Sequence, residues 1–189
     1  TILAMEKKVF AFQPDAVFCI AHVRDEARAF RYLLDMPREL IPFAELREIL
    51  ERANIREDTK PRKAFRRLEP YMDDILRWAY GRIVELCRRE KVLPVWICLP
   101  SEPGEKAPRK TAQLVSLAQQ AGFVVLNLSD VYDGYDGPSL QVAAWDKHPN
   151  AIGHRLIADR IYRALRENED KIPLGLTTSQ QAMTAPRSE

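Results

Sequence analysis

The chain has 189 residues, of which 46% are hydrophobic and 30% charged, and its formal net charge is +2. This composition is typical of a soluble globular protein with one domain, and the length suffices for a hydrophobic core. No apolar run approaches the roughly 20 residues needed to span a membrane, and the first ten residues lack the layout of a signal peptide. The nearly balanced charge gives no general case for nucleic-acid binding.

The first half of the chain predicts one strand and then several helices. The apolar run Ala16–Ala21 predicts a buried strand, and helical spacing of apolar residues follows over 24–36. Another helix is expected to begin at Pro42, since proline suits the first turn of a helix. A long helix is expected from Lys63 to Lys91, with an apolar stripe along one side.

The second half alternates strands and helices. The run VLPVWICLP predicts a strand over Val92–Leu99, and its nearly continuous apolarity fits a sheet that is covered on both faces. A helix over 107–121 should end at Gly122, a residue typical of helix C-termini. A third strand is predicted over Phe123–Leu128, and a last helix over Ala151–Asn168.

Strands separated by helices imply right-handed crossovers and a mostly parallel sheet with helices on both faces, a three-layer α/β/α sandwich. Sites in such folds lie beyond the carboxyl ends of the strands. The loops that begin at His22, Pro100 and Asp130 should therefore share one edge of the sheet. We expect one domain over residues 1–170 and a loose polar tail over 171–189.

The residues Asp146, His148, Pro149 and Asn150 directly precede the last helix. An Asp can orient a His, and the His can then act as a general base. The same residues also have a structural interpretation, because Asn150 is a good N-cap and Asp and His are common in turns. The position of this segment on the third loop keeps the catalytic interpretation open beside the structural one.

Other candidate features have simpler explanations. Cys19, Cys87 and Cys98 show neither a disulfide framework nor zinc-site spacing, so we predict that they are small core residues. The basic clusters KPRKAFRR and CRREK fall on helical patterns with interleaved acids, which favours a solvated face over a nucleic-acid site. No metal, nucleotide or flavin motif occurs, so no cofactor is expected.

The stretch WDKHPNAIGHRLIADRIYRAL resembles the C-terminal block of the SGNH (GDSL-like) hydrolases, which has an Asp, a His, Pro-Asn and Gly-His in this order. The stretch QPDAVFCIAHVRDEARA is similar to the central strand of that family. The resemblance covers most of the chain from Gln13 to Arg166. It implies the flavodoxin-like SGNH hydrolase fold and Ser-dependent acyl transfer, with His148 as the base and Asp146 as the acid that orients it.

The chain departs from the family pattern in two places. It contains no Gly-Asp-Ser block, so the nucleophilic Ser and the first strand are expected upstream of this chain. The family's Gly-x-Asn-Asp falls on residues 22–25, where His22 and Arg24 replace the usual Gly and Asn and are possible oxyanion donors. Trp145, beside the Asp-His pair, is a possible wall of the substrate pocket.

Two serines and one histidine are further candidates for a catalytic role. Ser101 and Ser139 lie in loops on the predicted edge and are less favoured nucleophiles, and His154 is typical of a helix residue. The Asp-x-His spacing resembles that of sugar O-acetyl esterases and acetyltransferases, which makes a carbohydrate or other small-molecule ester the expected substrate. The leading expectation is an ester hydrolase. An O-acetyltransferase and a non-catalytic domain that binds carbohydrate or protein are the alternatives.

Overall fold

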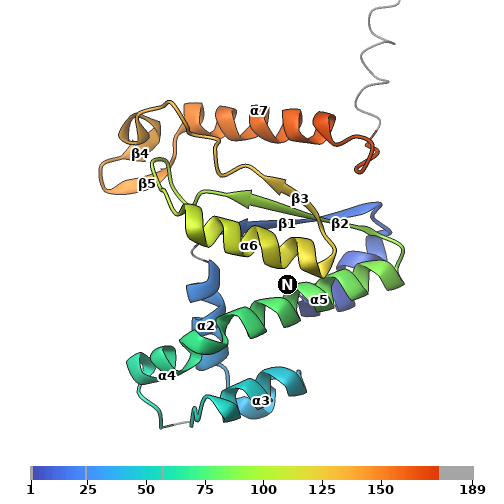
Figure 1. Cartoon of the computed structure of the whole chain (residues 1–189), viewed down its shortest axis with the longest axis vertical. Coiled ribbons are helices and arrows are strands. Elements are labelled where there is room, and N and C mark those ends of the chain that lie inside the picture. Colours follow the sequence, from blue (N-terminus) through green and yellow to red (C-terminus); the bar gives the residue numbers. More distant parts are fainter. Residues whose placement is uncertain (1, 24, 57, 175–189) are drawn as a thin grey trace, which may run out of the picture.

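The computed structural model describes residues 2–23, 25–56 and 58–174 (Figure 1). Three parallel strands form the central sheet in the order β1-β2-β3, namely β1 (Ala16–His22), β2 (Leu93–Leu99) and β3 (Val124–Asn127). His22 pairs with Leu99 and Cys98 with Asn127, so the carboxyl ends of the strands meet at one edge. The protein is mixed α/β, and the three predicted strands and their parallel pairing are confirmed.

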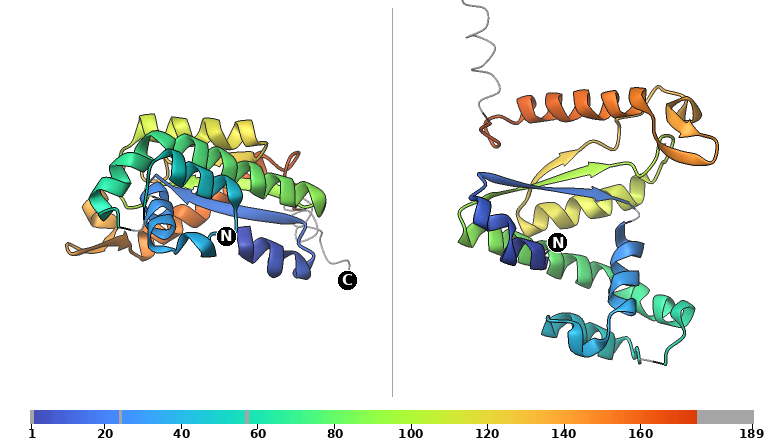
Figure 2. Two further views of the ribbon diagram at one scale, coloured as in Figure 1. Left: turned by 90° about the horizontal axis from the view of Figure 1, so that it is seen from below. Right: turned by 180° about the vertical axis from the view of Figure 1, so that it is seen from behind.

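Helices cover both faces of this sheet (Figures 1 and 2). Helix α7 (Ala151–Glu167) packs on one face, where Ala164 joins Val95 and Ile97 of β2. The opposite face is covered by α1 (Ile2–Lys7), α5 (Met72–Arg89) and α6 (Pro108–Ala121). Cover on both sides explains why nearly all of β2 is buried and apolar.

Between β1 and β2 the chain forms a helical unit beside the sheet layers (Figure 1). It consists of α2 (Asp25–Asp35), α3 (Ala44–Arg52), α4 (Pro61–Leu68) and the start of α5. Phe30 is fully buried in its core and meets Phe65 edge to face, with ring centroids 5.3 Å apart. Aromatic pairs in this geometry stabilise a core beyond the area they bury.

Two predicted helix bounds are wrong, each for a local backbone reason. The segment from Lys63 to Lys91 is not one helix, because the 3-10 turn Glu69–Tyr71 separates α4 from α5. Pro70 lies in this turn and cannot donate the N–H that a continuous helix requires. Pro42 does not begin α3, since Phe43 keeps an extended backbone and the helix starts at Ala44.

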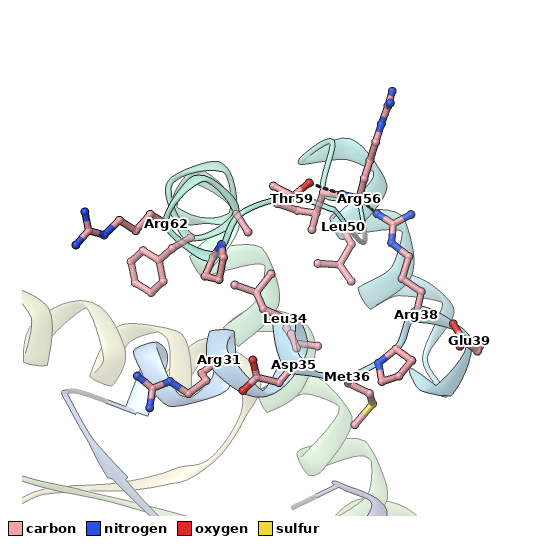
Figure 3. Close-up of a pocket in the computed structure, with 16 residues that line it drawn as sticks. Arg31, Leu34, Asp35, Met36, Arg38, Glu39, Leu50, Arg56, Thr59 and Arg62 are labelled. Atoms are coloured by element: carbon pink, nitrogen blue, oxygen red, sulfur yellow. Dashed lines mark hydrogen bonds between the residues drawn. The ribbon is translucent and has the colours of Figure 1, made fainter.

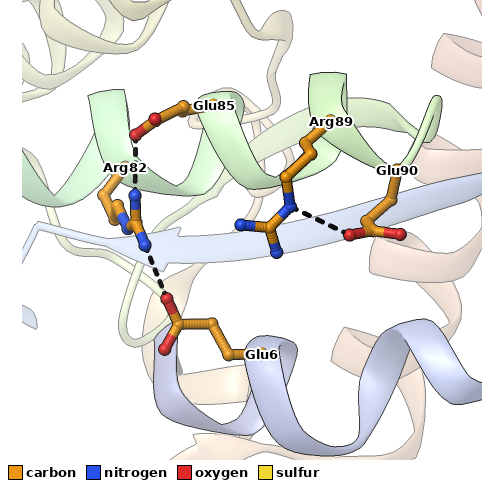
Figure 4. A network of polar contacts seen from close by, with 5 residues as sticks. All are labelled: Glu6, Arg82, Glu85, Arg89 and Glu90. Carbon is orange, nitrogen blue, oxygen red and sulfur yellow. Dashed lines mark hydrogen bonds and ion pairs between the residues drawn. The ribbon is translucent and has the colours of Figure 1, made fainter.

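Helix α1 is held on α5 by packing and by an ion pair (Figure 4). Arg82 Nη2 lies 2.8 Å from Glu6 Oε1, and Nη1 of the same guanidinium lies 2.9 Å from Glu85 Oε2. The hydrogen bonds to Glu6 and Glu85 raise the pKa of Arg82. Such partly exposed pairs contribute little stability each, so the buried Met5 supplies more of the attachment.

Strand β1 forms an open edge of the sheet. Among the described residues it pairs with β2 alone. Phe18 and Ile20 share a face with Val95 and Ile97, but of β1 only Ala16 packs against the core cluster that includes α7 on that face. Phe18 is therefore 38% exposed and Ile20 55% exposed. An apolar edge strand of this kind is prone to pair with another strand.

The three cysteines lie in or near the hydrophobic core. Cys87 and Cys98 are buried and Cys19 is half-buried, as predicted for core residues. Burial raises the pKa of the Cys19 and Cys87 thiols to about 11.

The packed part of the chain reaches the buried Ile172. Residues 175–189 of the predicted tail lie outside the described residues.

Within the described ranges, none of the helices combines the length and the apolar character that a membrane crossing requires.

Candidate functional site

The Asp-His pair lies on a short β-hairpin. Strands β4 (Gln141–Ala143) and β5 (Asp146–Pro149) pair antiparallel, and the chain turns at residues 144–145. The sequence predicted a turn in a loop for Asp146 and His148, and this prediction is wrong because both residues lie in β5. The two turn residues, Ala144 and Trp145, lack the Asn-Gly or Asp-Gly signal that marks a hairpin in a sequence. The strand geometry places Asp146 and His148 on the same face of β5, because side chains alternate along a strand.

Asp146 holds His148 through two contacts to one carboxylate oxygen. Oδ1 of Asp146 lies 2.6 Å from Nδ1 of His148 and accepts a hydrogen bond from the backbone N–H of His148 at 3.0 Å. The predicted hydrogen bond between the two side chains is therefore confirmed. With the proton on Nδ1 directed to the carboxylate, Nε2 is left unprotonated and able to act as a base. The His148 side chain is 84% exposed and that of Asp146 27% exposed.

The carboxylate of Asp146 is stabilised in its charged form. The backbone N–H of His148 contributes most and the imidazole next, and together they lower the pKa of Asp146 below its ordinary value of 3.8. As the pH falls, the unfolded chain takes up this proton before the folded chain does. The stabilisation of the folded state by this carboxylate is thus complete when the pH is above the pKa of Asp146 in the unfolded chain. It is lost as the pH falls through the lower pKa of Asp146 in the folded chain.

We expect an NMR titration of the Asp146 carboxyl carbon to give a pKa below 3.8. In a His148→Ala variant the pKa should rise only in part towards that value. The variant keeps the backbone N–H, which makes the larger contribution, and loses only the ring. An unshifted pKa in the unsubstituted protein, or complete loss of the shift in His148→Ala, would contradict this geometry.

Asn150 joins the hairpin to α7. Its Oδ1 accepts from the backbone N–H groups of Ile152 and Gly153, which caps the helix as predicted. Its Nδ2 donates to the carbonyls of Ser139 and Gln141. A Cβ on Gly153 would lie 2.9 Å from Cβ of Pro149, so glycine allows the first turn of α7 to pack on the hairpin. The Asp-His pair therefore has a fixed position relative to α7.

The hairpin is also attached to the loop that follows β2. Lys147 Nζ lies 3.9 Å from Glu102 Oε1, and the side chain of Gln141 donates to the carbonyl of Pro103. A Cβ on Gly137 would lie 2.9 Å from Cα of Gly104, so the two backbones touch. These contacts position the Asp-His pair at the carboxyl edge of the sheet. None of these contacts was predicted, because each joins residues more than 30 positions apart.

A cavity of about 280 Å³ lies at the same edge of the sheet. The segments after all three strands contribute to it, as the predicted arrangement of loops requires. Thr111 is its buried polar residue, and Glu105, Asp130 and Asp133 give the lining an acidic character that Lys106 partly offsets. The cavity provides room for a small polar molecule beside the strand ends.

The other predicted site residues have different surroundings. His22 ends β1 and is half-buried, with its Nδ1 3.3 Å from the carbonyl oxygen of Pro100. Trp145 is 85% exposed at the tip of the hairpin, next to the Asp-His pair in the chain. Arg24 lies outside the described residues. His154 is exposed on α7, as expected of a helix residue.

Neither alternative serine is hydrogen bonded to the ring of His148. The hydroxyl of Ser139 donates to the carbonyl of Asp136 at 2.7 Å. The hydroxyl of Ser101 is buried, and the backbone N–H of Ser101 donates to Glu105. Within the part of the chain that the structure describes, no serine hydroxyl is hydrogen bonded to Nε2 of His148.

The described residues contain no group of three or more His, Cys, Asp or Glu side chains able to hold a metal ion. The sequence matches no model of a known protein family, and no curated protein or solved structure matches the chain.

Proposed function

We propose that this chain is part of a Ser-His-Asp ester hydrolase with the SGNH-type α/β/α fold. His148 is its general base and Asp146 is the acid that orients the base. The observation that supports the proposal most strongly is the 2.6 Å contact between Nδ1 and Oδ1, which leaves Nε2 of an 84% exposed ring available. A His buried for packing alone would not present its second nitrogen to solvent at the carboxyl edge of a parallel sheet.

The proposed reaction proceeds in two halves. Nε2 of His148 takes the proton of a serine hydroxyl as the serine oxygen attacks the ester carbonyl. The imidazolium then protonates the leaving alcohol as the ester C–O bond breaks, which leaves an acyl-enzyme. Water repeats the sequence, giving its proton to Nε2 and releasing the carboxylic acid and the serine. Asp146 stabilises the imidazolium in both halves, and offsets the unfavourable effect of the N-terminus of α7 on that cation.

The serine, in this proposal, belongs to a segment that pairs with the open edge of β1. No other strand of the described residues pairs with that edge, and Phe18 and Ile20 on its face are exposed. An added parallel strand with its own helix would satisfy both the backbone and the apolar face. The serine would follow this strand and so reach the edge of the sheet where the hairpin holds His148.

Trp145 supports a carbohydrate ester as the substrate. Its indole is exposed at the tip of the hairpin, one position before Asp146 in the chain, and the apolar face of such a ring can stack on a sugar. An O-acetyltransferase would use the same residues, with a sugar hydroxyl in place of water in the second half. A carbohydrate-binding domain without catalysis would use Trp145 alone.

The proposal is tested by measuring the rate of ester hydrolysis by residues 1–189 and by a longer chain that includes the Ser-bearing segment. We expect residues 1–189 to hydrolyse p-nitrophenyl acetate no faster than the background of an exposed His, because a base without its nucleophile can only activate water. A longer chain with the Ser-bearing segment should give a burst of p-nitrophenol as the acyl-enzyme forms. Turnover by residues 1–189 that Ser101→Ala or Ser139→Ala abolishes would place the nucleophile in this chain and overturn the proposal.

A further inference from the structure

Helix α5, which lies between α6 and α3, has one narrow face that the rest of the described chain leaves open (Figure 1). Residues three or four positions apart form this α5 face, namely Asp74, Arg77, Gly81, Glu85 and Arg88, of which Asp74 is half-buried and the others are exposed. A groove of about 450 Å³ lies toward the start of α3 and one of about 490 Å³ toward the end of α6. The α5 face shares no residue with the cavity between α2, α3 and α4 that Figure 3 shows.

Gly81 lies near the middle of α5 and lines both grooves. Glycine destabilises the interior of a helix relative to alanine. Packing within the described chain does not require it, because a Cβ at this position would meet no atom within 4 Å outside its own stretch of helix. Gly153 differs in this respect, since its Cβ would lie 2.9 Å from Pro149. The missing side chain at Gly81 therefore leaves the backbone of α5 open to close approach by a second helix.

The charges of the α5 face are self-complementary about Gly81. Arg77 lies four positions before Gly81 and Glu85 four positions after it, each about 6 Å away along the helix axis. If a second copy of α5 crosses antiparallel at Gly81, Arg77 of each copy faces Glu85 of the other. Asp74 and Arg88, seven positions to either side, match in the same way. In a parallel crossing each charge would face its own copy, so repulsion selects the antiparallel arrangement.

The helix dipole explains only part of this pattern. Acids near the N-terminus and bases near the C-terminus stabilise any helix, which accounts for Asp74 and Arg88 without a second copy. Arg77 and Glu85 have the opposite order, so the dipole does not account for them. Within the chain, Arg77 lies 3.3 Å from Asp74 and Glu85 lies 2.9 Å from Arg82. These pairs are partly exposed and hence weak, which leaves Arg77 and Glu85 able to pair with a second copy.

We propose that the α5 face binds a second copy of this chain in a two-fold symmetric dimer. The two α5 helices are antiparallel and cross at Gly81, and Arg77 of each copy forms an ion pair with Glu85 of the other. The grooves on both sides of α5 receive the side chains that flank the crossing. The dimer uses neither the hairpin nor the open edge of β1, so it is independent of the proposed reaction.

Charge reversal provides the first test, read by sedimentation equilibrium of residues 1–189 up to roughly 0.5 mM. All samples carry Ile20→Lys, which opposes pairing through β1. Arg77→Glu alone and Glu85→Arg alone each place like charges together twice, so each should weaken the dimer about tenfold or more. In a mixture of the two variants, opposite charges face each other at both places, and a heterodimer should form within about threefold of the original Kd. A mixture that stays monomeric would overturn the proposal.

The matched control consists of Arg163→Glu and Glu167→Arg, which reverse two exposed charges four positions apart on α7. Each should change the Kd of the dimer less than about twofold, because α7 lies outside the α5 face. Far-UV circular dichroism checks that all four variants are folded. Equal weakening by the α7 variants would show a general effect of charge and would refute the interface.

The substitution Gly81→Gln tests the crossing point without changing a charge. Glutamine forms helices better than glycine and its side chain has free space here, so the midpoint of thermal unfolding of the dilute monomer should rise. The same side chain would stand between the two backbones, so the dimer should weaken about tenfold or more. These opposite directions separate loss of the interface from a folding defect. An unchanged Kd in Gly81→Gln would overturn the proposal. So would an unsubstituted chain that remains monomeric, since another partner would then cover the α5 face.

Discussion

The substitution His148→Ala is expected to abolish ester hydrolysis in the longer chain that carries the proposed serine. A base that belongs to a triad acts as a unit with its nucleophile, so kcat should fall by about 10⁴-fold or more. The measurement is the steady-state rate with p-nitrophenyl acetate. Asp146→Asn should also lower kcat strongly, since an amide at this position no longer selects the tautomer with the proton on Nδ1.

The control for His148→Ala is His154→Ala, which removes the exposed imidazole of α7. It should leave kcat within about twofold, because this ring lies on the helix rather than against Asp146. Folding should not differ between the two variants, since each removes an exposed side chain and surface substitutions cost less than about 0.5 kcal/mol. If the longer chain keeps its activity after His148→Ala, the assignment of the base is wrong.

Local signals in the sequence were sufficient to predict the strands of the central sheet and the start of α7. The apolar run of β2 predicted a strand covered on both faces, and the parallel order of the strands followed from the helices between them. Asn150 predicted the start of α7 because an N-cap acts on its own neighbours. The short spacing of Asp146 and His148 predicted their contact, and the strand that they form places both side chains on one face.

Features that depend on contacts between residues far apart along the chain could not be predicted from the sequence. The hairpin is set by pairing between β4 and β5, by Lys147 against Glu102 and by the contact of Gly137 with Gly104, and no local pattern records these contacts. The helices of the helical unit were predicted singly. Their packing on one another depends on contacts such as that of Phe30 with Phe65, which is 35 positions away.

At the open edge of β1, the substitution Ile20→Lys is expected to have one effect in residues 1–189 and a different effect in a longer chain that carries the proposed strand. In residues 1–189, Ile20 is 55% exposed, so a lysine should change the free energy of unfolding by less than about 0.5 kcal/mol. It should also reduce self-association, since a charge on an edge strand opposes pairing with another copy. Chemical denaturation and analytical ultracentrifugation measure the two effects.

In the longer chain the same substitution should destabilise the protein by roughly 3 kcal/mol or more, because the added strand and its helix would bury the charge without a partner. Val142→Lys is the matched control. Val142 is also 55% exposed on a strand, but it lies on β4 and away from the proposed new contact. It should have little effect on unfolding at either length. A small effect of Ile20→Lys in the longer chain would mean that its added segment leaves this face of β1 uncovered. The proposed completion of the sheet would then be wrong, although the role of His148 would be tested separately by its own substitution.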